Sequence, residues 1–154
     1  MYKIGRNLSE HKVYSEIVQE YHYLPEDYIY TEDFNLFYKF YENYAYYDDA
    51  NTTCQTDGAY VATPRSYDEN QFLIDLFPNK DLWIGVNDID SEGDFISVDG
   101  HKMTYFRWGS NEPNDMGGNE DGVQIVGTVH YGEISKWNDV SIERLFRFVC
   151  FRRL

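Results

Sequence analysis

Apolar residues recur at helical spacing near the start of the chain, where Val13, Ile17 and Tyr21 follow one another at intervals of four. This spacing predicts a short helix over residues 9–23, and a proline two residues later would end it. The signals of a folded domain become stronger only after this segment. We therefore expect residues 1–33 to form an N-terminal arm that packs against the domain or joins copies of it.

A strand and a helix are predicted next. Residues 34–41 are rich in aromatic side chains, which favours a strand. Residues 48–56 are predicted to be helical because Ala50 and Cys54 lie four residues apart on one face. Gly58 then supplies the stop signal that is expected just after a helix.

The start of a second helix is marked by its first turn. Ser66 and Glu69 form the sequence pattern of a capping box, in which each side chain binds the backbone N–H of the other residue. The helix must end before Pro78, because the residue that precedes a proline avoids helical backbone angles. Its expected inner face is apolar and consists of Phe72, Leu73 and Leu76.

After this helix the pattern changes to strands. An uninterrupted apolar run indicates a buried strand, and two further runs flank Asp99-Gly100, a strong signal for a hairpin turn. A polar stretch without periodicity follows, and then two closing strands. The predicted strands cover residues 82–86, 95–98, 103–108, 123–127 and 145–151.

The length and composition of the chain fit one compact domain. Its 154 residues can bury a real core, and the 15 Tyr, 10 Phe and 3 Trp argue for a folded, sheet-rich domain. The elements follow the order of one strand, two helices and then strands around one long loop. This order predicts an α+β domain over residues 34–154.

The charge of the chain limits its partners. A formal net charge of −14 argues against nucleic acid and anionic lipid, which both require clustered Lys and Arg. No apolar run approaches the roughly 20 residues needed to cross a bilayer, so we expect no membrane span. Most of the 27 acidic residues would form a solvated surface. A converging subset would suit a hard cation, which prefers oxygen ligands.

The cysteine content leaves two interpretations open. Cys54 and Cys150 are the only cysteines, so they form neither a structural zinc site nor a closely spaced redox pair. They are either buried thiols or one disulfide of a secreted protein. Glycosylation sequons at Asn7 and Asn51 favour secretion. The N-terminus lacks the pattern of a signal peptide, so a secreted form would be a processed chain.

Acidic residues concentrate in the polar stretch that ends at Asp121. Residues 111–121 read Asn-Glu-Pro-Asn-Asp-Met-Gly-Gly-Asn-Glu-Asp, and more carboxylates lie at residues 88–92 and at Asp139. Neighbouring carboxylates repel one another unless a cation neutralises them. Calcium fits, because it takes about six to eight oxygens in irregular geometry. Composition alone gives a solvated polar loop equal weight, and the ligand spacing of an EF-hand is absent.

Short motifs in this chain occur in the order and at the spacing of the C-type lectin-like domain, and the chain resembles that family over residues 34–153. Each motif is weak alone, but the ordered set is highly specific. The motifs are Ala50…Cys54…Gly58, Glu69-Asn70, Trp83-Ile84-Gly85, Trp108…Glu112-Pro113-Asn114, Asn119-Glu120-Asp121, Trp137-Asn138-Asp139 and Phe148-Val149-Cys150.

The resemblance implies a fold with two helices, two small antiparallel sheets and a long calcium-binding loop. It favours a disulfide between Cys54 and Cys150, joining the first helix to the last strand, and a secreted or extracellular protein. Family members usually carry a second disulfide that braces the long loop. Gly122 and Ile142 occupy those two positions here, so we expect the loop to depend more strongly on bound metal.

The resemblance also implies one or two calcium ions as cofactors. Pro113 would adopt the cis form, which turns Glu112 and Asn114 towards the primary ion. Met116 is an apolar residue in the loop, and it either contacts bound sugar or packs within the loop. The primary ion would be held by Glu112, Asn114, Glu120, Asn138 and Asp139. The second ion would be held by Asp88, Glu92, Asp115, Glu120 and Asp121, with Glu120 contributing its backbone carbonyl.

The ligand implied for such a site is a glycan. Two neighbouring sugar hydroxyls would complete the primary shell, donating protons to Glu112 and Glu120 and accepting hydrogen bonds from the amides of Asn114 and Asn138. In the family, the Glu-Pro-Asn order suits mannose, fucose, N-acetylglucosamine or glucose, whereas Gln-Pro-Asp suits galactose. The expected partners are glycans or glycoproteins that carry mannose-type sugars. Shallow sites of this kind bind weakly, so a homo-oligomer would supply avidity.

Two other classes of function compete with this interpretation. A related module could bind a protein or a biomineral surface through its acidic face. An enzyme is not expected, because the sequence shows no nucleophile–base pair, metal-hydrolase spacing or phosphate loop. The four histidines match no catalytic spacing; they are His11, His22, His101 and His130. The three tryptophans border predicted strands, which favours a core role; they are Trp83, Trp108 and Trp137.

Overall fold

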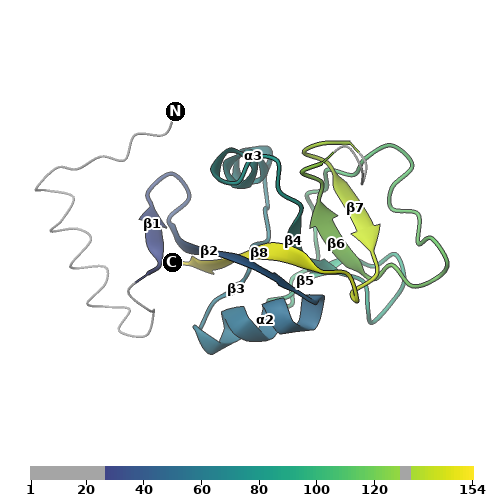
Figure 1. The fold of residues 1–154 in the computed structure, drawn as a ribbon, viewed down its shortest axis with the longest axis horizontal. Helices are drawn as coiled ribbons and strands as arrows, with labels where there is room; N and C mark the ends of the chain where they lie inside the picture. The colour runs from purple at the N-terminus through teal and green to yellow at the C-terminus, as the bar shows by residue number, and fades with distance from the viewer. Residues whose placement is uncertain (1–26, 129–132) are drawn as a thin grey trace, which may run out of the picture.

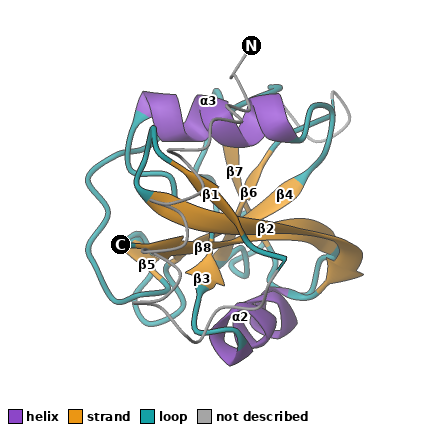
Figure 2. Ribbon diagram, turned by 90° about the vertical axis from the view of Figure 1, so that its left-hand side faces the viewer, coloured by secondary structure: helices purple, strands orange, loops and turns teal. Residues whose placement is uncertain are grey.

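The computed structural model describes residues 27–128 and 133–154, which form one sheet covered by a helix on each face (Figure 1). Figure 2 shows the same layers from the side, with α3 above the sheet and α2 below it. The helices are α2 (Tyr47–Thr56) and α3 (Tyr67–Leu76). The strands are β1 (Ile29–Thr31), β2 (Leu36–Ala45), β3 (Tyr60–Val61), β4 (Leu82–Asn87), β5 (Ile96–Ser97), β6 (Gly122–Ile125), β7 (Trp137–Val140) and β8 (Phe146–Arg153).

The two antiparallel sheets expected from the sequence are joined into one mixed sheet. Its main path runs β1-β2-β8-β4-β6-β7, with β3 paired to β8 and β5 paired to β4. All pairs are antiparallel except β4 and β8, which run parallel over Leu82↔Arg147 and Trp83↔Phe148. This short parallel contact is the seam between the two antiparallel halves. The expected α+β architecture with two helices is therefore confirmed.

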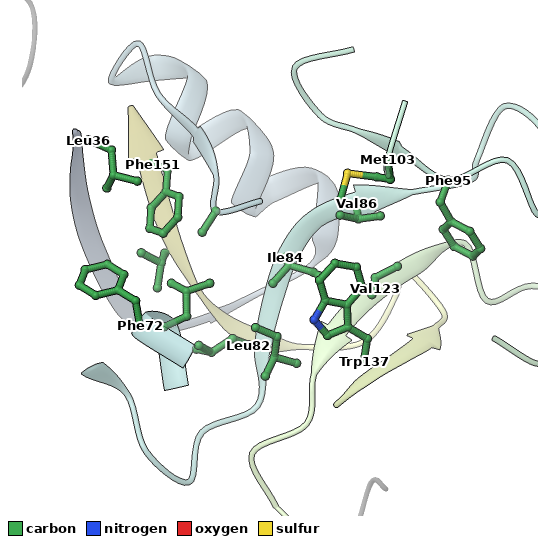
Figure 3. Packing of buried hydrophobic residues seen from close by; sticks show 14 residues of the cluster. Leu36, Phe72, Leu82, Ile84, Val86, Phe95, Met103, Val123, Trp137 and Phe151 are labelled. Atoms are coloured by element: carbon green, nitrogen blue, oxygen red, sulfur yellow. The ribbon is translucent and has the colours of Figure 1, made fainter. Parts of the chain in front are cut away.

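The apolar run in β4 is buried because the strand has a core on both faces. Its six residues are all buried. Successive side chains of a strand point to opposite faces, and Ile84 accordingly lies in the α3-side core, while Trp83 lies in the α2-side core. Figure 3 shows part of the α3-side core, where Phe72, Leu82, Ile84 and Trp137 are gathered. A strand buried on both faces needs apolar residues throughout.

The predictions of the two helices that follow residue 47 are confirmed, with one difference in the cap of α3. In α2, Ala50 and Cys54 are buried, and Gly58 follows the helix with a φ of +68°. In α3, the Ser66 side chain accepts the N–H of Glu69 at 3.2 Å. The Glu69 carboxylate accepts the N–H of Arg65 instead of that of Ser66. Only half of the capping box therefore forms.

Some strand predictions were wrong in extent. Residues 103–108 do not form a strand, and the predicted hairpin is reduced to the short β5 and a single bridge between Ile96 and Lys102. The Asp99-Gly100 turn itself forms, since the Gly100 N–H donates to the Ser97 carbonyl at 2.8 Å.

The bounds and the number of the other strands also differ from the predictions. The strand expected at residues 34–41 runs from Leu36 to Ala45, and the closing strand expected at residues 145–151 extends to Arg153. β1 comes from the segment expected to form the N-terminal arm and pairs with β2. β3 and β7 were not predicted. The helix predicted at residues 9–23 and the sequon at Asn7 lie outside the described residues.

The predicted disulfide between Cys54 and Cys150 is present, and it joins α2 to β8 with its Cα atoms 5.4 Å apart. It closes a loop with a sequence separation of 96 residues. In the chain-entropy model, a loop of this length contributes about 4–5 kcal/mol to folding stability.

The two positions at which the resemblance implies a second disulfide are in packing contact here. A Cβ atom built on Gly122 would lie 3.2 Å from Cγ2 of Ile142 and 3.0 Å from Cζ3 of Trp83. Gly122 begins β6 and Ile142 follows β7, so the two residues are neighbours in the fold although the connection between these strands separates them in the sequence.

We expect the double variant Gly122→Cys with Ile142→Cys to form a disulfide and to raise the melting temperature of the metal-free protein. The two positions are already adjacent, so the crosslink would restrict the unfolded chain with little movement of the backbone. Thermal unfolding is compared between the oxidised double variant and the single variant Gly122→Cys, both without reductant, because reductant would also open the Cys54–Cys150 disulfide. The single variant is the control, since its side chain also crowds Trp83 but cannot form the crosslink. An oxidised double variant that melts no higher than this control would contradict the expectation.

Candidate calcium-binding site

The residues predicted for the primary site come from two parts of the fold. Asn138 and Asp139 lie on β7, which pairs with β6 at one end of the sheet (Figure 1). Glu112, Asn114 and Glu120 lie on the long loop that precedes β6. The core anchors β7, because Trp137 is fully buried and its indole N–H donates to Oδ1 of Asn70 at 2.7 Å.

The carboxylate of Asp139 fixes the loop to the strand. It is 1% exposed and accepts the backbone N–H of Asn114 at 3.0 and 3.1 Å and that of Asp115 at 2.7 Å. The peptide bond between Glu112 and Pro113 is cis, as the resemblance implied. The amide Nδ2 of Asn114 donates to Oε2 of Glu112 at 2.7 Å. These contacts bring Glu112, Asn114 and Asp139 together.

The amide of Asn138 completes this cluster and can present either of its two polar atoms. One amide position lies 3.2 and 3.1 Å from the two carboxylate oxygens of Glu112 and 3.2 Å from the backbone carbonyl of Asp139. With nitrogen in that position, Asn138 donates hydrogen bonds to these acceptors. With oxygen in that position, several oxygens converge as they would around a hard cation. The donor set therefore fits calcium.

Glu120 closes the same loop from its far end. Its carboxylate accepts the backbone N–H of Met116 at 2.8 Å, so the chain between them folds into a compact turn. Met116 is 71% exposed and does not pack within the loop core. The side chain of Met116 is therefore accessible at the loop surface, and its contact with a sugar stays a prediction.

The carboxylates of this cluster carry like charges and repel one another. Burial, the neighbouring Asp139 and the charge of Glu120 together raise the pKa of Glu112 to about 7. Burial and the charge of Asp139 also raise the pKa of Glu120. A raised carboxylate pKa means that the ionised form is disfavoured in the metal-free fold. A bound cation would remove this penalty.

A second acidic group lies beside the first. Oxygens of Asp88, Glu92 and Asp121 lie within 4.8 Å of one another. Oδ2 of Asp88 accepts the N–H of Gly93 at 2.8 Å, whereas the buried Oδ1 has no hydrogen-bond partner within residues 27–128 and 133–154. Burial raises the pKa values of Asp88 and Glu92, and the surrounding carboxylates raise them further. An unpaired buried carboxylate oxygen is costly and suits a cation ligand.

Asp115, which was predicted for the second site, is placed between the two groups. Its Oδ1 accepts the N–H of Glu120 at 3.2 Å, and its charge raises the pKa values of Glu92 and Glu120. It is not part of the group formed by Asp88, Glu92 and Asp121. Of the other predicted second-site residues, Asp88, Glu92 and Asp121 lie together, and the role of the Glu120 backbone carbonyl stays a prediction.

Two features near the primary site were missed by the sequence analysis. Glu133 accepts the N–H of Ser110 at 3.1 Å and borders a cavity of about 140 Å³ that Glu112 and Asn138 also line. Gln124 pairs across the strands with Asn138 and is fully buried, and neither of its amide atoms has a hydrogen-bond partner among the described residues. Neither residue belongs to a motif.

Among the described residues, neither helix is long and apolar enough to cross a bilayer.

The predicted roles of the aromatic residues and histidines can also be compared with the structure. Trp83 and Trp137 are fully buried core residues, and Trp108 packs edge-on against Trp137 at a centroid distance of 5.8 Å. His101 lies beside Asp99 on the turn after β5. The remaining histidines fall outside the described residues.

Known proteins share both the sequence pattern and the fold of this chain. The family model described as "Lectin C-type domain" matches residues 44–152. Lectin BRA-3 from Megabalanus rosa is 38% identical over 104 residues, which cover 66% of this chain and 62% of that protein. The chain thus spans less than two thirds of that relative's length.

Solved structures show the same fold in proteins with different titles. The carbohydrate-recognition domain of cow CD23, determined in the presence of a GlcNAc2Man3 oligosaccharide, is 31% identical with a TM-score of 0.73, covering 84% of this chain and 95% of that one. A calcium-independent type II antifreeze protein is 19% identical with a TM-score of 0.72, covering 84% and 93%. The second comparison shows the fold alone. With the family match extending over most of the chain, the protein belongs to the C-type lectin domain family.

Proposed function

We propose that this chain is a calcium-dependent carbohydrate-binding domain with mannose-type specificity. The observation that carries the proposal is the convergence of Glu112, Asn114, Asn138 and Asp139 through the contacts described above, with Glu120 closing the same loop. The similarity to BRA-3, named as a lectin, and to a CD23 domain solved with an oligosaccharide supports it.

The arrangement of charges and amides suggests how the site would bind a sugar. Glu112, Asn114, Glu120, Asn138 and Asp139 would hold the calcium ion, which would supply two coordination positions for neighbouring sugar hydroxyls. Glu112 and Glu120 accept the protons of those hydroxyls, because ionised carboxylates are acceptors only. Asn114 and Asn138 donate their amide N–H groups to the hydroxyl oxygens. Each polar atom of the diol is thereby satisfied without a deep pocket.

The order of acceptor and donor would determine which sugars fit. Glu112 places an acceptor on one side of the cis proline and Asn114 places a donor on the other. In this family, that order suits the equatorial 3- and 4-hydroxyls of mannose-type sugars. A diol of the wrong geometry would leave a donor or acceptor unpaired, at roughly 1–3 kcal/mol per group.

The fold also occurs in proteins with other binding tasks, as the similarity to the calcium-independent antifreeze protein illustrates. A domain that recognises a protein or mineral surface is therefore the competing proposal. A glycan array, run in calcium and again in chelator, separates the two. Glycan binding that disappears in chelator supports the carbohydrate function, and an array without signal in either buffer opposes it.

We expect immobilised mannose to retain the protein in calcium and free mannose or fucose to elute it, whereas galactose elutes it poorly. The double variant Glu112→Gln with Asn114→Asp should lose most of this preference, because it exchanges donor and acceptor while keeping the net charge. Glu143→Gln removes an exposed carboxylate outside the site and should behave as the unmodified protein does. A stronger response of the unmodified protein to galactose would overturn the donor–acceptor argument.

Calcium should stabilise the fold, because only the folded chain assembles the ligands. At a calcium concentration 100 times the dissociation constant, linkage adds about 2.7 kcal/mol. For a domain of this size, that raises the melting temperature by roughly 5–10 °C. Magnesium at equal concentration should do less, since it requires a smaller, octahedral shell. Asp139→Ala should abolish the response, and equal melting temperatures in calcium and chelator would contradict the calcium site.

The pH dependence should have opposite signs with and without calcium. In the metal-free fold the pKa of Glu112 is raised to about 7, so this group stabilises the fold at acid pH and loses that contribution as the pH rises towards 7. Calcium binding requires the ionised form, so binding at pH 7 should release protons and weaken on acidification.

Calorimetry in two buffers of different ionisation enthalpy measures these protons directly. Proton release should decrease at pH 8.5, where Glu112 is already ionised, and should be smaller in Glu112→Gln. Calcium binding at pH 6 and pH 8 with the same affinity would show that the carboxylate cluster does not bind the ion.

A further inference from the structure

A cavity of about 370 Å³ lies beside the C-terminal half of β8, where that strand pairs with β3, and Asp99 of the turn after β5 also lines it. The site residues of β7 lie at the other end of the molecule in Figure 1. The cavity volume is at the lower end of the range for small-molecule sites and is far larger than a single inorganic anion requires. No residue of the candidate calcium site lines it.

Positive charge is concentrated at this cavity in an otherwise acidic protein. The chain has 13 Lys and Arg against 27 Asp and Glu. Three of those basic residues, Arg65, Arg152 and Arg153, line the same cavity. Asp99 is the one carboxylate among the described lining residues. Guanidinium groups repel one another, and an oxyanion placed between them would be favoured.

The three guanidinium groups are already held in place by neighbouring acceptors. Nη1 and Nη2 of Arg153 bind the two carboxylate oxygens of Glu69 at 2.7 Å each. Nη1 of Arg152 donates to the carbonyl of Gly58 at 3.0 Å. Arg65 pairs with Asp99, and 40% of the Arg65 side chain remains exposed. Pre-positioned donors reduce the entropy lost when a ligand binds.

The remaining walls of the cavity suit a ring. Tyr60 is 43% exposed and presents an aromatic side chain at the cavity, while Phe151 is buried at the cavity wall. Asp99 adds a carboxylate that can accept from a hydroxyl, whereas the buried Thr63 hydroxyl already donates to the Gly85 carbonyl at 2.9 Å. Aromatic, acidic and guanidinium groups together match a compound with an apolar ring face, hydroxyls and one oxyanion.

We propose that this cavity is a second binding site, independent of calcium, for an acidic saccharide unit that carries a sulfate or carboxylate group. Arg65 is the exposed guanidinium that binds the oxyanion, Tyr60 covers the ring face, and Asp99 tunes the affinity by competing for Arg65. The carboxylate of Asp99 opposes an anionic ligand, so its removal strengthens binding. This sign distinguishes a binding role from a structural one.

Titration of the full chain in calcium-free, chelator-free buffer tests the site separately from the proposed calcium function. The probes are glucose 6-sulfate, inorganic sulfate and glucose, followed by amide chemical shifts or calorimetry. Glucose 6-sulfate should bind several-fold more tightly than inorganic sulfate, and glucose should not bind. Arg65→Gln should weaken binding about tenfold, the effect of losing one charge-assisted hydrogen bond. Asp99→Asn should strengthen it.

Arg147→Gln is the matched control, because Arg147 also pairs with one carboxylate, that of Glu42, but lies outside the cavity. This variant should bind glucose 6-sulfate as the unmodified protein does. Equal losses in Arg65→Gln and Arg147→Gln would reduce the effect to general charge and overturn the proposal. Equal affinity for sulfate and glucose 6-sulfate, absence of saturable binding, or weaker binding by Asp99→Asn would overturn it as well.

Discussion

The carboxylate of Asp139 accepts the backbone N–H groups of Asn114 and Asp115, and this attachment positions a loop that has no helix or strand of its own. The attachment point is itself fixed from within the core. Trp137, two residues earlier on β7, is fully buried and bonded to Asn70 of α3. The core therefore fixes the position of the candidate site through one short strand, β7. The loop supplies the remaining side chains of the site.

The same attachment also brings the negatively charged carboxylates of the site close to one another. Once Asn114 and Asp115 are held against Asp139, Glu112 and Glu120 are brought close to its negative charge, and their pKa values are raised. Backbone N–H groups offset part of this cost, since Asp139, Glu120 and Asp115 each accept at least one. Fold stability and the proposed metal binding would thus use the same oxygens, and the two could not be optimised separately.

The sequence predicted those parts of the fold that local patterns control. Helical spacing located α2 and α3, the apolar run located β4, and the ordered motifs led to the family and to the disulfide. Short elements were missed because long-range pairing creates them: β3 and β7 gain their strand geometry from β8 and β6. The predicted strand at residues 103–108 failed because its aromatic residues pack around Trp137 instead of pairing with a neighbouring strand.

The site showed the same division between local and long-range information. Motif positions predicted the acidic residues, but they carried no information about Gln124 or Glu133, which reach the site through strand pairing and loop packing. The assignment of Asp115 to the second ion stays a prediction, and its contact with the N–H of Glu120 depends on the fold of the loop. The cavity lined by Arg65, Arg152 and Arg153 was equally invisible, because its residues come from distant segments.

The amide of Asn138 has two ends of nearly equal shape and opposite hydrogen-bonding character, and it faces Glu112 and the Asp139 carbonyl from a paired strand. A half-turn about its last side-chain bond is enough to exchange a donor for an acceptor at that place. The strand beneath it need not move, because its backbone hydrogen bonds involve other atoms. The same side chain can therefore offer its oxygen to an ion or its nitrogen to Glu112 on one unchanged stretch of sheet.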